Sequence, residues 1–495
     1  MEKYILSIDQ GTTGSRVLIV NPSGHMVANA YAEFPQIYPR PGWVEHDPEV
    51  IWQTTLGVMR QALTSANLEP DRIAAMGITN QRETTVVWDR KTLRPVHNAI
   101  VWQCRRSAGI CEKLKAEGLE GMFRERTGLL LDAYFSGTKL KWLLDEIPGL
   151  RARAKFGELA FGTVDTWLIA RLTGGRLHVT DYTNASRTLM FNIHDRMWDP
   201  GLLDVLDIPA AVLPGVAASA HVTGLTDADI VGAEIPIAGI AGDQQAALFG
   251  QACFDEGQAK NTYGTGCFLL LNVGRRRVDP GPGLLLTLAC DRSGGPCYAL
   301  EGSVFIAGAV VQWLRDGLGL VGSAAETQAL AESVADTQGV HLVPAFAGLG
   351  APHWDMYARG GILGITRGTN RAHIVRAALE SIAFQTGELT AAVETATGFK
   401  FTELRVDGGA CRNDFLMQFQ ADLLGCPVNR SGNIESTGMG AAFLAGRAVG
   451  FWQTPEAMAA LRVSEKIFYP KVDAEQRRRL YRGWTDAVER VKSSR

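Results

Sequence analysis

The chain has 495 residues, of which 46% are hydrophobic and 20% charged, and its formal net charge at pH 7 is −3. This length predicts roughly two to four domains. The balanced charge argues against a protein that binds nucleic acid or an anionic membrane surface. The longest uncharged apolar stretches, such as 302–314, are shorter than the ~20 residues that span a bilayer. We therefore predict a soluble protein with large hydrophobic cores.

The eight cysteines show no short zinc-site spacing and are accompanied by no histidine cluster. A chain of this length can build its core without disulfides. The apolar stretch within 1–9 is too short for a signal peptide and is typical of a first strand. We expect reduced, mostly buried thiols in a cytoplasmic protein.

Strands and helices are predicted to alternate along the chain, which indicates an α/β fold. In the first half the predicted strands are 4–9, 16–20, 26–34, 73–79 and 84–89, with a helix starting at Asp47-Pro48 and another at 160–172. In the second half the predicted strands are 235–241, 258–263, 267–273 and 404–406, with an apolar helix at 302–314. Similar turns follow the first strands of both halves, which suggests two related domains, 1–247 and 257–495.

Two turns have the composition of an anion-binding loop. Asp9 ends a strand and is followed by Gly11, Thr12 and Thr13, whose N–H and hydroxyl groups could bind phosphate while Asp9 holds Mg²⁺. Thr265 and Gly266 lie in a second turn of this kind. Ordinary polar hairpin turns would explain either segment equally well.

Two strand-to-helix turns could carry chemistry. Asp243 follows a buried strand and precedes an alanine-rich helix, a position suited to a general base. Gly409 would let a flat ring lie against the backbone, and Asn413 offers a donor and an acceptor to a base edge. As alternatives, Asp243 and Asn413 could simply cap helices.

The common nucleotide-binding motifs are missing. The chain has no P-loop sequence and no protein-kinase catalytic set. The run Gly438-Met439-Gly440-Ala441-Ala442-Phe443 starts like a dinucleotide fingerprint but places phenylalanine where the third glycine belongs, which indicates tight helix packing instead. On the 302–314 helix, Gly308 and Gln312 lie one turn apart, as they also would in a packed core helix.

A polar loop and two aromatic segments could bind a small hydroxylated substrate. Arg82 and Glu83 are adjacent at a strand break, where a charged pair is costly to bury unless it is paired or bound to a ligand. Trp102 and the Tyr134-Phe135 pair could cover a carbon backbone. A surface ion pair and two core aromatics are the alternative explanation.

Taken together, these segments resemble the FGGY carbohydrate kinase family, and the resemblance runs through essentially the whole chain. It rests on residues 9–13, 80–84, 102–103, 242–250, 261–268 and 407–409, and on two longer signatures at 134–143 and 360–380. It implies two ribonuclease-H-like domains of the actin/hexokinase type that flank an active-site cleft. It also implies ATP-dependent phosphorylation of glycerol, with ATP and Mg²⁺ required.

The resemblance implies a role for each candidate residue. Asp243 would be the general base, and Asp9 and Asp243 would help to place Mg²⁺. The glycerol site would comprise Arg82, Glu83, Trp102, Tyr134, Asp243, Gln244 and Phe268. The nucleotide site would comprise Gly11, Thr12, Thr13, Gly14, Arg16, Thr265, Gly266, Gly308, Gln312, Gly409 and Asn413. The resemblance further implies a homodimer or homotetramer.

The sequence departs from the family pattern in two places. Gly14 stands where a serine is usual in the first phosphate turn, which removes one hydroxyl contact. Segment 229–234 is acidic, whereas members inhibited by fructose 1,6-bisphosphate carry a glycine-rich loop ending in arginine there. An acidic segment would repel the bisphosphate, so we expect weak or absent inhibition.

Two alternatives remain open at this stage. One is a member of the same family that phosphorylates a pentulose or a sugar acid. The other is a non-catalytic protein of the same fold, either a sugar-sensing regulator or an actin-like polymer. ATPase activity that depends on an added polyol would distinguish these possibilities.

Overall fold

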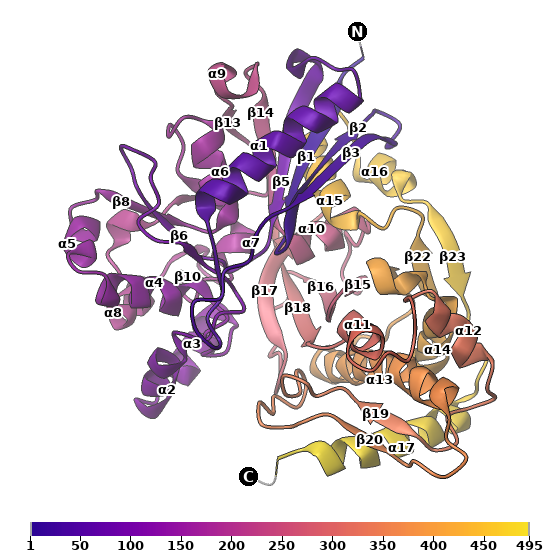
Figure 1. Ribbon diagram of the computed structural model, residues 1–495. Helices are drawn as coiled ribbons and strands as arrows, with labels where there is room; N and C mark the ends of the chain where they lie inside the picture. Colours follow the sequence, from indigo (N-terminus) through magenta and orange to yellow (C-terminus); the bar gives the residue numbers. More distant parts are fainter. Residues whose placement is uncertain (1, 494–495) are drawn as a thin grey trace. The chain divides into compact units, whose positions relative to one another are not determined.

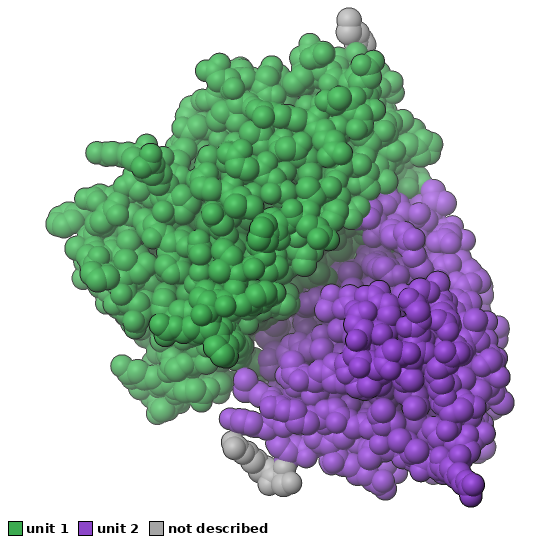
Figure 2. All heavy atoms as spheres, viewed as in Figure 1, with its two compact units in different colours: residues 1–254, 286–298, 436–461 green, residues 255–285, 299–435, 462–495 purple. Residues whose placement is uncertain are grey.

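The computed structural model describes residues 2–493, which divide into two compact units (Figure 2). Unit 1 comprises 1–254, 286–298 and 436–461, and unit 2 comprises 255–285, 299–435 and 462–495. Each unit is thus assembled from segments that are far apart in the sequence. No helix within 2–493 is both long and apolar enough to cross a membrane.

Unit 1 contains the first fourteen strands and twelve helices. The strands are β1 (Tyr4–Gln10), β2 (Gly14–Val20), β3 (Met26–Glu33), β4 (Glu45–His46), β5 (Ile73–Asn80), β6 (Val86–Asp89), β7 (Ala99–Ile100), β8 (Leu159–Gly162), β9 (Val179–Asp181), β10 (Phe191–Asn192), β11 (Met197–Trp198), β12 (Gly215–Ala217), β13 (Ala220–Leu225) and β14 (Pro236–Gly242). The helices are α1 (Pro48–Ser65), α2 (Ala108–Ala116), α3 (Glu120–Thr127), α4 (Ser136–Glu146), α5 (Leu150–Lys155), α6 (Val164–Leu172), α7 (Tyr182–Ala185), α8 (Pro200–Leu206), α9 (Ala228–Val231), α10 (Asp243–Gly250), α15 (Ser436–Ala448) and α16 (Pro455–Leu461).

The main sheet of unit 1 has the strand order β13-β14-β5-β1-β2-β3 (Figure 1). Strands β1, β2 and β3 form an antiparallel meander, and β14, β5 and β1 run parallel to one another. Gln10 and Gly242 both pair with Asn80, so the three parallel strands end at one edge of the sheet. Segments that follow these strands are therefore brought together there, as is usual for ligand sites in α/β sheets.

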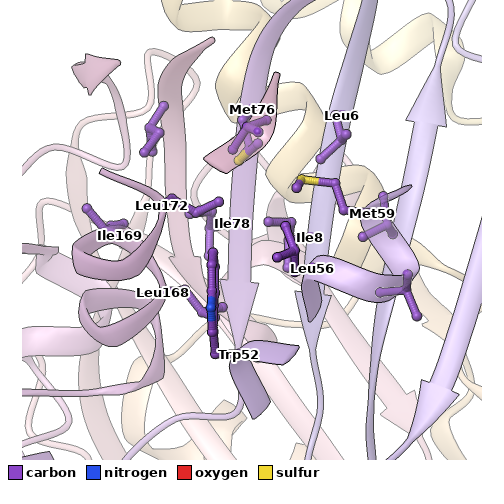
Figure 3. Close-up of a cluster of buried hydrophobic side chains, with 14 of the residues drawn as sticks. Leu6, Ile8, Trp52, Leu56, Met59, Met76, Ile78, Leu168, Ile169 and Leu172 are labelled. Carbon is purple, nitrogen blue, oxygen red and sulfur yellow. The ribbon is translucent and has the colours of Figure 1, made fainter. Parts of the chain in front are cut away.

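Both faces of this sheet are covered by helices. On one face α1 and α6 pack their apolar side chains, including Trp52, Leu56 and Leu168, against Ile8 and Ile78 (Figure 3). Leu6 belongs to the same core as Ile8, whereas the adjacent Ile5 belongs to the core on the other face, which α10 and α15 cover. Alternate residues of β1 thus enter two different cores, which explains why the strand is apolar on both sides.

Helix α15 approaches the sheet and α10 unusually closely. A Cβ atom at Gly440 would lie 1.8 Å from Ala246 O, and one at Gly77 would lie 2.2 Å from Ala441 O. Side chains at these positions would force the elements apart. The prediction that the 438–443 glycines serve helix packing is therefore confirmed.

Unit 2 contains a second mixed sheet, a separate two-stranded sheet formed by residues 341–343 and 361–363, and helices of its own. Its strands are β15 (Ala259–Tyr263), β16 (Cys267–Gly274), β19 (His341–Val343), β20 (Gly361–Leu363), β21 (Leu404–Asp407), β22 (Val428–Ser431) and β23 (Ser464–Phe468), and its helices are α11 (Gly308–Asp316), α12 (Glu326–Glu332), α13 (Arg371–Thr397), α14 (Asp414–Leu424) and α17 (Ala474–Val491). Segment 286–298, with most of β17 (Leu285–Cys290) and the start of β18 (Pro296–Val304), is assigned to unit 1. The α/β class predicted from the sequence is confirmed.

Two helices were predicted with the wrong N-terminal boundary. Residues 159–162 form β8, which pairs with β6, and the helix starts only at Val164. Residues 302–304 end β18, and the helix starts only at Gly308. In both segments an apolar run continues from strand to helix, so hydrophobicity alone cannot locate the boundary.

Candidate active site

In unit 1 the predicted catalytic and polyol residues gather where β1, β5 and β14 end. Asp9 is the penultimate residue of β1, Arg82 and Glu83 follow β5, and Asp243 is the first residue of α10 after β14. The three strands are hydrogen-bonded neighbours. The parallel register of the sheet, which the sequence alone does not specify, thus brings together residues 9, 82, 83 and 243.

Asp243 is fixed by an arginine and by its own helix. Arg82 Nε lies 3.1 Å from Asp243 Oδ1, and the Gln244 N–H donates to the same oxygen at 2.7 Å. The carboxylate is at the N-terminal end of α10, where the helix dipole favours negative charge. Arg82 is 2% exposed and Asp243 is 30% exposed at the side chain. The arginine is therefore part of the interior, whereas the carboxylate remains accessible to a ligand.

Glu83 is held in a strained conformation. Its φ of 61° lies in the left-handed region, which side chains other than glycine rarely adopt. The Ser136 hydroxyl donates to its carbonyl at 3.0 Å, and Arg187 Nε lies 2.6 Å from its carboxylate. Such strain persists only when the surrounding structure imposes it, and it concentrates at functional sites.

Two of the aromatic residues predicted for the substrate site, Trp102 and Tyr134, lie together in unit 1. The Trp102 and Tyr134 rings are 5.6 Å apart and meet edge to face. Both are half-buried. Trp102 Nε1 also donates to Thr12 Oγ1 at 2.9 Å, which links the aromatic pair to the first predicted phosphate turn. Phe268, the remaining predicted aromatic, lies on β16 in unit 2.

The first predicted phosphate turn is a tight hairpin connection between β1 and β2. The Gly11 N–H donates to Gly14 O at 2.9 Å, and side-chain amides of Gln81 and Gln36 donate to Gly11 O and Thr12 O at 3.1 Å. With its carbonyls fixed in this way, the backbone conformation of the turn is set before any ligand binds. Arg16 stands opposite Asp9 in the register of strands β1 and β2. Its guanidinium carbon lies 5.1 Å from the centre of the Tyr31 ring.

In unit 2 the predicted nucleotide residues also share one end of a sheet. Strands β15 and β21 are parallel with Thr262 opposite Asp407, so the turns at 263–266 and 408–413 follow at the same edge. The Gly308 N–H donates to Gly264 O at 2.9 Å, which places the start of α11 against the first of these turns. This arrangement brings together Thr265, Gly266, Gly308 and Gly409, with Gln312 one helical turn further along α11.

Two glycines of this second group differ in the space around them. A Cβ at Gly409 would meet no atom within 4 Å, whereas one at Gly308 would lie 2.6 Å from Gly264 O. The open position suits a flat ring, and the tight one lets α11 start against the turn. Asn413 caps α14 by accepting from the Leu416 N–H at 3.0 Å, and its amide donates to Thr327 at 3.1 Å.

Two buried cations in unit 1 were missed by the sequence analysis. Arg187 pairs with Glu83, and Lys139 Nζ donates to the carbonyls of Tyr134 and Phe135. Burial lowers the pKa of Lys139 to about 8. Arg187 lies in none of the motifs named above, and only the tertiary fold brings it to Glu83. Lys139 lies within the 134–143 signature, but that pattern does not show that its ammonium group is buried against nearby carbonyls.

No group of three or more histidine, cysteine, aspartate or glutamate side chains suited to a metal occurs in the described part of the chain. Asp9, half-buried at the end of β1, and Asp243 remain the carboxylates assigned to Mg²⁺. Mg²⁺ commonly uses one or two carboxylates together with substrate phosphates and water. This donor set suits that mode of binding. All eight cysteines are free and buried, as predicted.

A mixed sheet in each unit, with polar turns at one end of its parallel strands, defines a two-domain α/β fold. Residues 4–250 match the N-terminal domain model of the FGGY family of carbohydrate kinases, and residues 259–449 match its C-terminal domain model. The chain therefore belongs to this family of enzymes.

Named relatives match the chain over nearly its full length. Glycerol kinase 2 of Thermotoga maritima is 59% identical over 99% of this chain and 98% of its own length. The glycerol kinase of Carboxydothermus hydrogenoformans is 58% identical with the same coverage. The crystal structure of Plasmodium falciparum glycerol kinase with ADP superposes with a TM-score of 0.93 at 38% identity, covering 99% of this chain and 98% of that one.

Proposed function

We propose that this protein transfers the γ-phosphoryl group of ATP to a primary hydroxyl of glycerol, giving glycerol 3-phosphate. The observation that carries the proposal is the group formed by Arg82, Glu83 and Asp243 beside the Trp102–Tyr134 pair. Buried charges next to an aromatic pair suit a small molecule with adjacent hydroxyls and a short carbon backbone. The names of the full-length relatives support glycerol as that molecule.

Each polyol residue has a task in this proposal. Glu83 accepts hydrogen bonds from hydroxyls and Arg82 donates to them, and Tyr134 and Gln244 also bond the hydroxyls. Trp102 and Phe268 cover the carbon atoms. Asp243 accepts the proton of the attacking hydroxyl and directs its oxygen toward the γ-phosphorus. Because Oδ1 is held by Arg82 and Gln244, we assign the proton to Oδ2.

The nucleotide is assigned to the turns in both units. Gly11, Thr12, Thr13, Gly14 and Arg16 would contact phosphates through N–H, hydroxyl and guanidinium groups, as would Thr265 and Gly266. Gly308, Gln312, Gly409 and Asn413 would contact the rest of the nucleotide, with the open space at Gly409 facing a flat ring. Magnesium, held by Asp9 and Asp243 with phosphate oxygens, would supply neutralisation of the phosphate charge.

The experiment that tests the proposal is ADP release from Mg-ATP by the purified chain, with and without acceptor. The acceptors are glycerol, xylulose, ribulose, gluconate, erythritol and dihydroxyacetone. We expect release that depends on glycerol, with glycerol preferred over every other acceptor. Activity with a sugar instead of glycerol would identify a different family member, and no acceptor-dependent release would favour a non-catalytic protein.

Two finer features belong to the same proposal. The eight buried free cysteines suit the reducing conditions of the cytoplasm, where we place the protein. We also propose a homodimer or homotetramer, by analogy with the family. Sedimentation of the purified chain at micromolar concentration would distinguish these assemblies from a monomer.

A further inference from the structure

Arg187 is a fully buried arginine that the proposed chemistry does not use directly. It lies between α7 and β10, and its side chain has a relative exposure of 0%. Its Nε atom is 2.6 Å from Glu83 Oε1. Burying a guanidinium group is costly even when it is paired, and a hydrophobic residue often serves stability as well. An arginine at this position therefore calls for a reason other than core packing.

The same guanidinium group also contacts the aromatic part of the site. Its Cζ atom lies 5.7 Å from the centre of the Tyr134 ring and 5.3 Å from that of Phe135. A planar guanidinium can stack on rings while its N–H groups bind a carboxylate, which a lysine cannot reproduce. Arg187 is thus in contact with Glu83 and Tyr134, two residues that we assign to the substrate.

The other contacts of Glu83 fix its backbone. Ser136 and Thr85 hydroxyls donate to the Glu83 carbonyl at 3.0 and 3.3 Å, and φ is held at 61°. On the other side Arg82 Nε lies 3.9 Å from Glu83 Oε1 and 3.1 Å from Asp243 Oδ1. The charges therefore alternate from Arg187 through Glu83 and Arg82 to Asp243, with Arg187 at the buried end.

We propose that Arg187 is a positioning residue for the acceptor site. Arg187 holds the Glu83 carboxylate and the Tyr134 side chain where both can contact the substrate hydroxyls. The inference rests on the proposed function, because it takes Glu83 and Tyr134 as substrate contacts. Arg187 itself touches no reacting atom. Its loss should therefore weaken acceptor binding selectively and leave nucleotide binding unchanged.

The chain offers a closely matched control for this test. The Arg106 side chain is also fully buried, lies 2.6 Å from a carboxylate oxygen of Glu45, and stacks over the Trp43 ring at 4.0 Å. Arg106 belongs to no part of the candidate site. Arg106 also lies over the Trp142 ring at 4.8 Å. Replacing either arginine by methionine removes one buried charge, one ion pair and contacts with two rings, so general effects on the fold should be alike.

The test compares steady-state KM values for glycerol and ATP in the unmodified chain and in Arg187→Met, Arg187→Lys, Glu83→Gln, Arg187→Met/Glu83→Gln and Arg106→Met. Loss of a charge-assisted hydrogen bond predicts that Arg187→Met raises KM for glycerol on the order of 30-fold. We expect KM for ATP to stay within about twofold. In the Glu83→Gln background, Arg187→Met should add little, because its partner carboxylate is already gone.

A binding measurement makes the outcome independent of turnover. Glycerol should raise the melting temperature of the unmodified chain and of Arg106→Met, and raise that of Arg187→Met much less. If Arg187→Met does not fold, Arg187→Lys carries the test: it retains the charge but not the planar fork, and should raise only the KM for glycerol, by a smaller factor.

The results separate this inference from the proposed function. An unmodified chain that neither binds nor phosphorylates glycerol would overturn the proposed function. An unmodified chain that phosphorylates glycerol, together with Arg187 variants whose KM for glycerol is unchanged, would overturn only the role of Arg187. The role of Arg187 would also be overturned if Arg187→Met changed the KM values for glycerol and ATP equally, as loss of a merely structural arginine would. It would likewise be overturned if the effect of Arg187→Met added fully to that of Glu83→Gln.

Discussion

Arg82 Nε lies 3.1 Å from Asp243 Oδ1, which joins the loop after β5 to the first residue of α10. Gly242 makes this contact possible, since a Cβ there would lie 2.7 Å from Arg82 Cδ. The Gly242 N–H also donates to the Thr183 hydroxyl at 2.8 Å. The carboxylate assigned as general base is therefore fixed from its side chain and from its backbone.

The first prediction concerns this carboxylate. Asp243→Asn keeps the shape of the side chain but removes its ability to accept a proton, so we expect kcat to fall by about 10²–10⁴-fold. Glycerol should still raise the melting temperature of the variant. Asp207→Asn is the control, because Asp207 also pairs with an arginine, Arg151 at 2.8 Å, outside the site. Near-normal turnover in Asp243→Asn would exclude Asp243 as the base.

The second prediction concerns the hydrogen bond of 2.9 Å between Trp102 Nε1 and Thr12 Oγ1. Trp102→Phe and Thr12→Val should each raise KM for both glycerol and ATP, because the bond links a polyol residue to a phosphate residue. Together they should show a coupling of about 1 kcal/mol in a double-mutant cycle of kcat/KM. Trp198→Phe is the control, as Trp198 Nε1 donates to Pro214 O at 2.9 Å. Additive effects would show that the bond does not couple the two.

Local sequence patterns located several of the longer strands, such as β1 and β5, but not β8 or the end of β18, and not the neighbours of each strand. The three strands between Tyr4 and Glu33 and the helix start at Asp47 were predicted, because alternating apolar residues, turn residues and capping residues act within a few positions. The covering of β1 and β5 by α15, more than 350 residues later, depends on long-range packing, and no local pattern records it.

The candidate site was predicted in the same uneven way. Residues such as Asp9 and Asp243 lie in motifs, so they could be chosen from the sequence. Arg187 contacts Glu83 through the tertiary fold, and its surroundings in the sequence match no motif. Lys139 lies within the 134–143 signature, but its burial against the Tyr134 carbonyl could not be predicted from that pattern. The roles of all these residues, and the domain boundary near 247–257, stay predictions.

The third prediction concerns Gly14, where the family usually has serine. A Cβ at this position would lie 2.6 Å from Ala32 O and 2.7 Å from the Tyr31 ring. We expect Gly14→Ser to destabilise the protein by about 1–3 kcal/mol, because backbone and ring must move to make room. Gly57→Ser on α1 is the control, since a Cβ there meets no atom within 4 Å.

Chemical denaturation of both glycine variants measures the effect. Adding Tyr31→Ala to Gly14→Ser should restore only part of the stability, because the clash with Ala32 O remains. A Gly14→Ser variant as stable as the unmodified chain would mean that β3 moves aside at no cost. In that case the missing hydroxyl contact would have no steric explanation.

The fourth prediction concerns regulation. Asp227 caps α9 by accepting from the Asp229 N–H at 3.0 Å, and Asp227 also pairs with Arg176. The segment that follows, 229–234, contains two acidic residues and no arginine. It therefore offers no guanidinium group to a bisphosphate. We expect fructose 1,6-bisphosphate at 1 mM or below, assayed at ~0.1 M ionic strength to limit screening, to leave the initial rate unchanged. Strong inhibition would reveal a binding mode that does not need this segment.

The last prediction concerns His46, a fully buried residue beside the first phosphate turn. Its Nε2 is 2.7 Å from Gln36 Oε1 and its Nδ1 is 3.4 Å from Gln81 Nε2. These partners assign the proton to Nε2, so a second proton on Nδ1 would face the Gln81 amide donor. Burial lowers the pKa of His46 to about 4.

The unfolded chain binds this proton near pH 6.5, and the folded chain binds it only near pH 4. The contribution of neutral His46 to the unfolding free energy is therefore fully present above pH 6.5 and is lost as the pH falls to 4. The loss should reach about 3 kcal/mol. Carboxyls such as Asp165, whose pKa burial raises to about 7, act in the opposite direction. Comparing the unmodified chain with His46→Gln removes their contribution.

The pKa itself can be read from the NMR shifts of labelled imidazole carbons between pH 3.5 and 8. The difference in unfolding free energy between the two proteins should shrink as the pH falls from 6.5 to 4. Gln36 and Gln81 donate to the carbonyls of Thr12 and Gly11, so protonation of His46 should also weaken ATP binding as the pH approaches 4. A His46 that titrates near 6.5 would show that these glutamines can rearrange, and that the phosphate turn does not depend on a neutral imidazole.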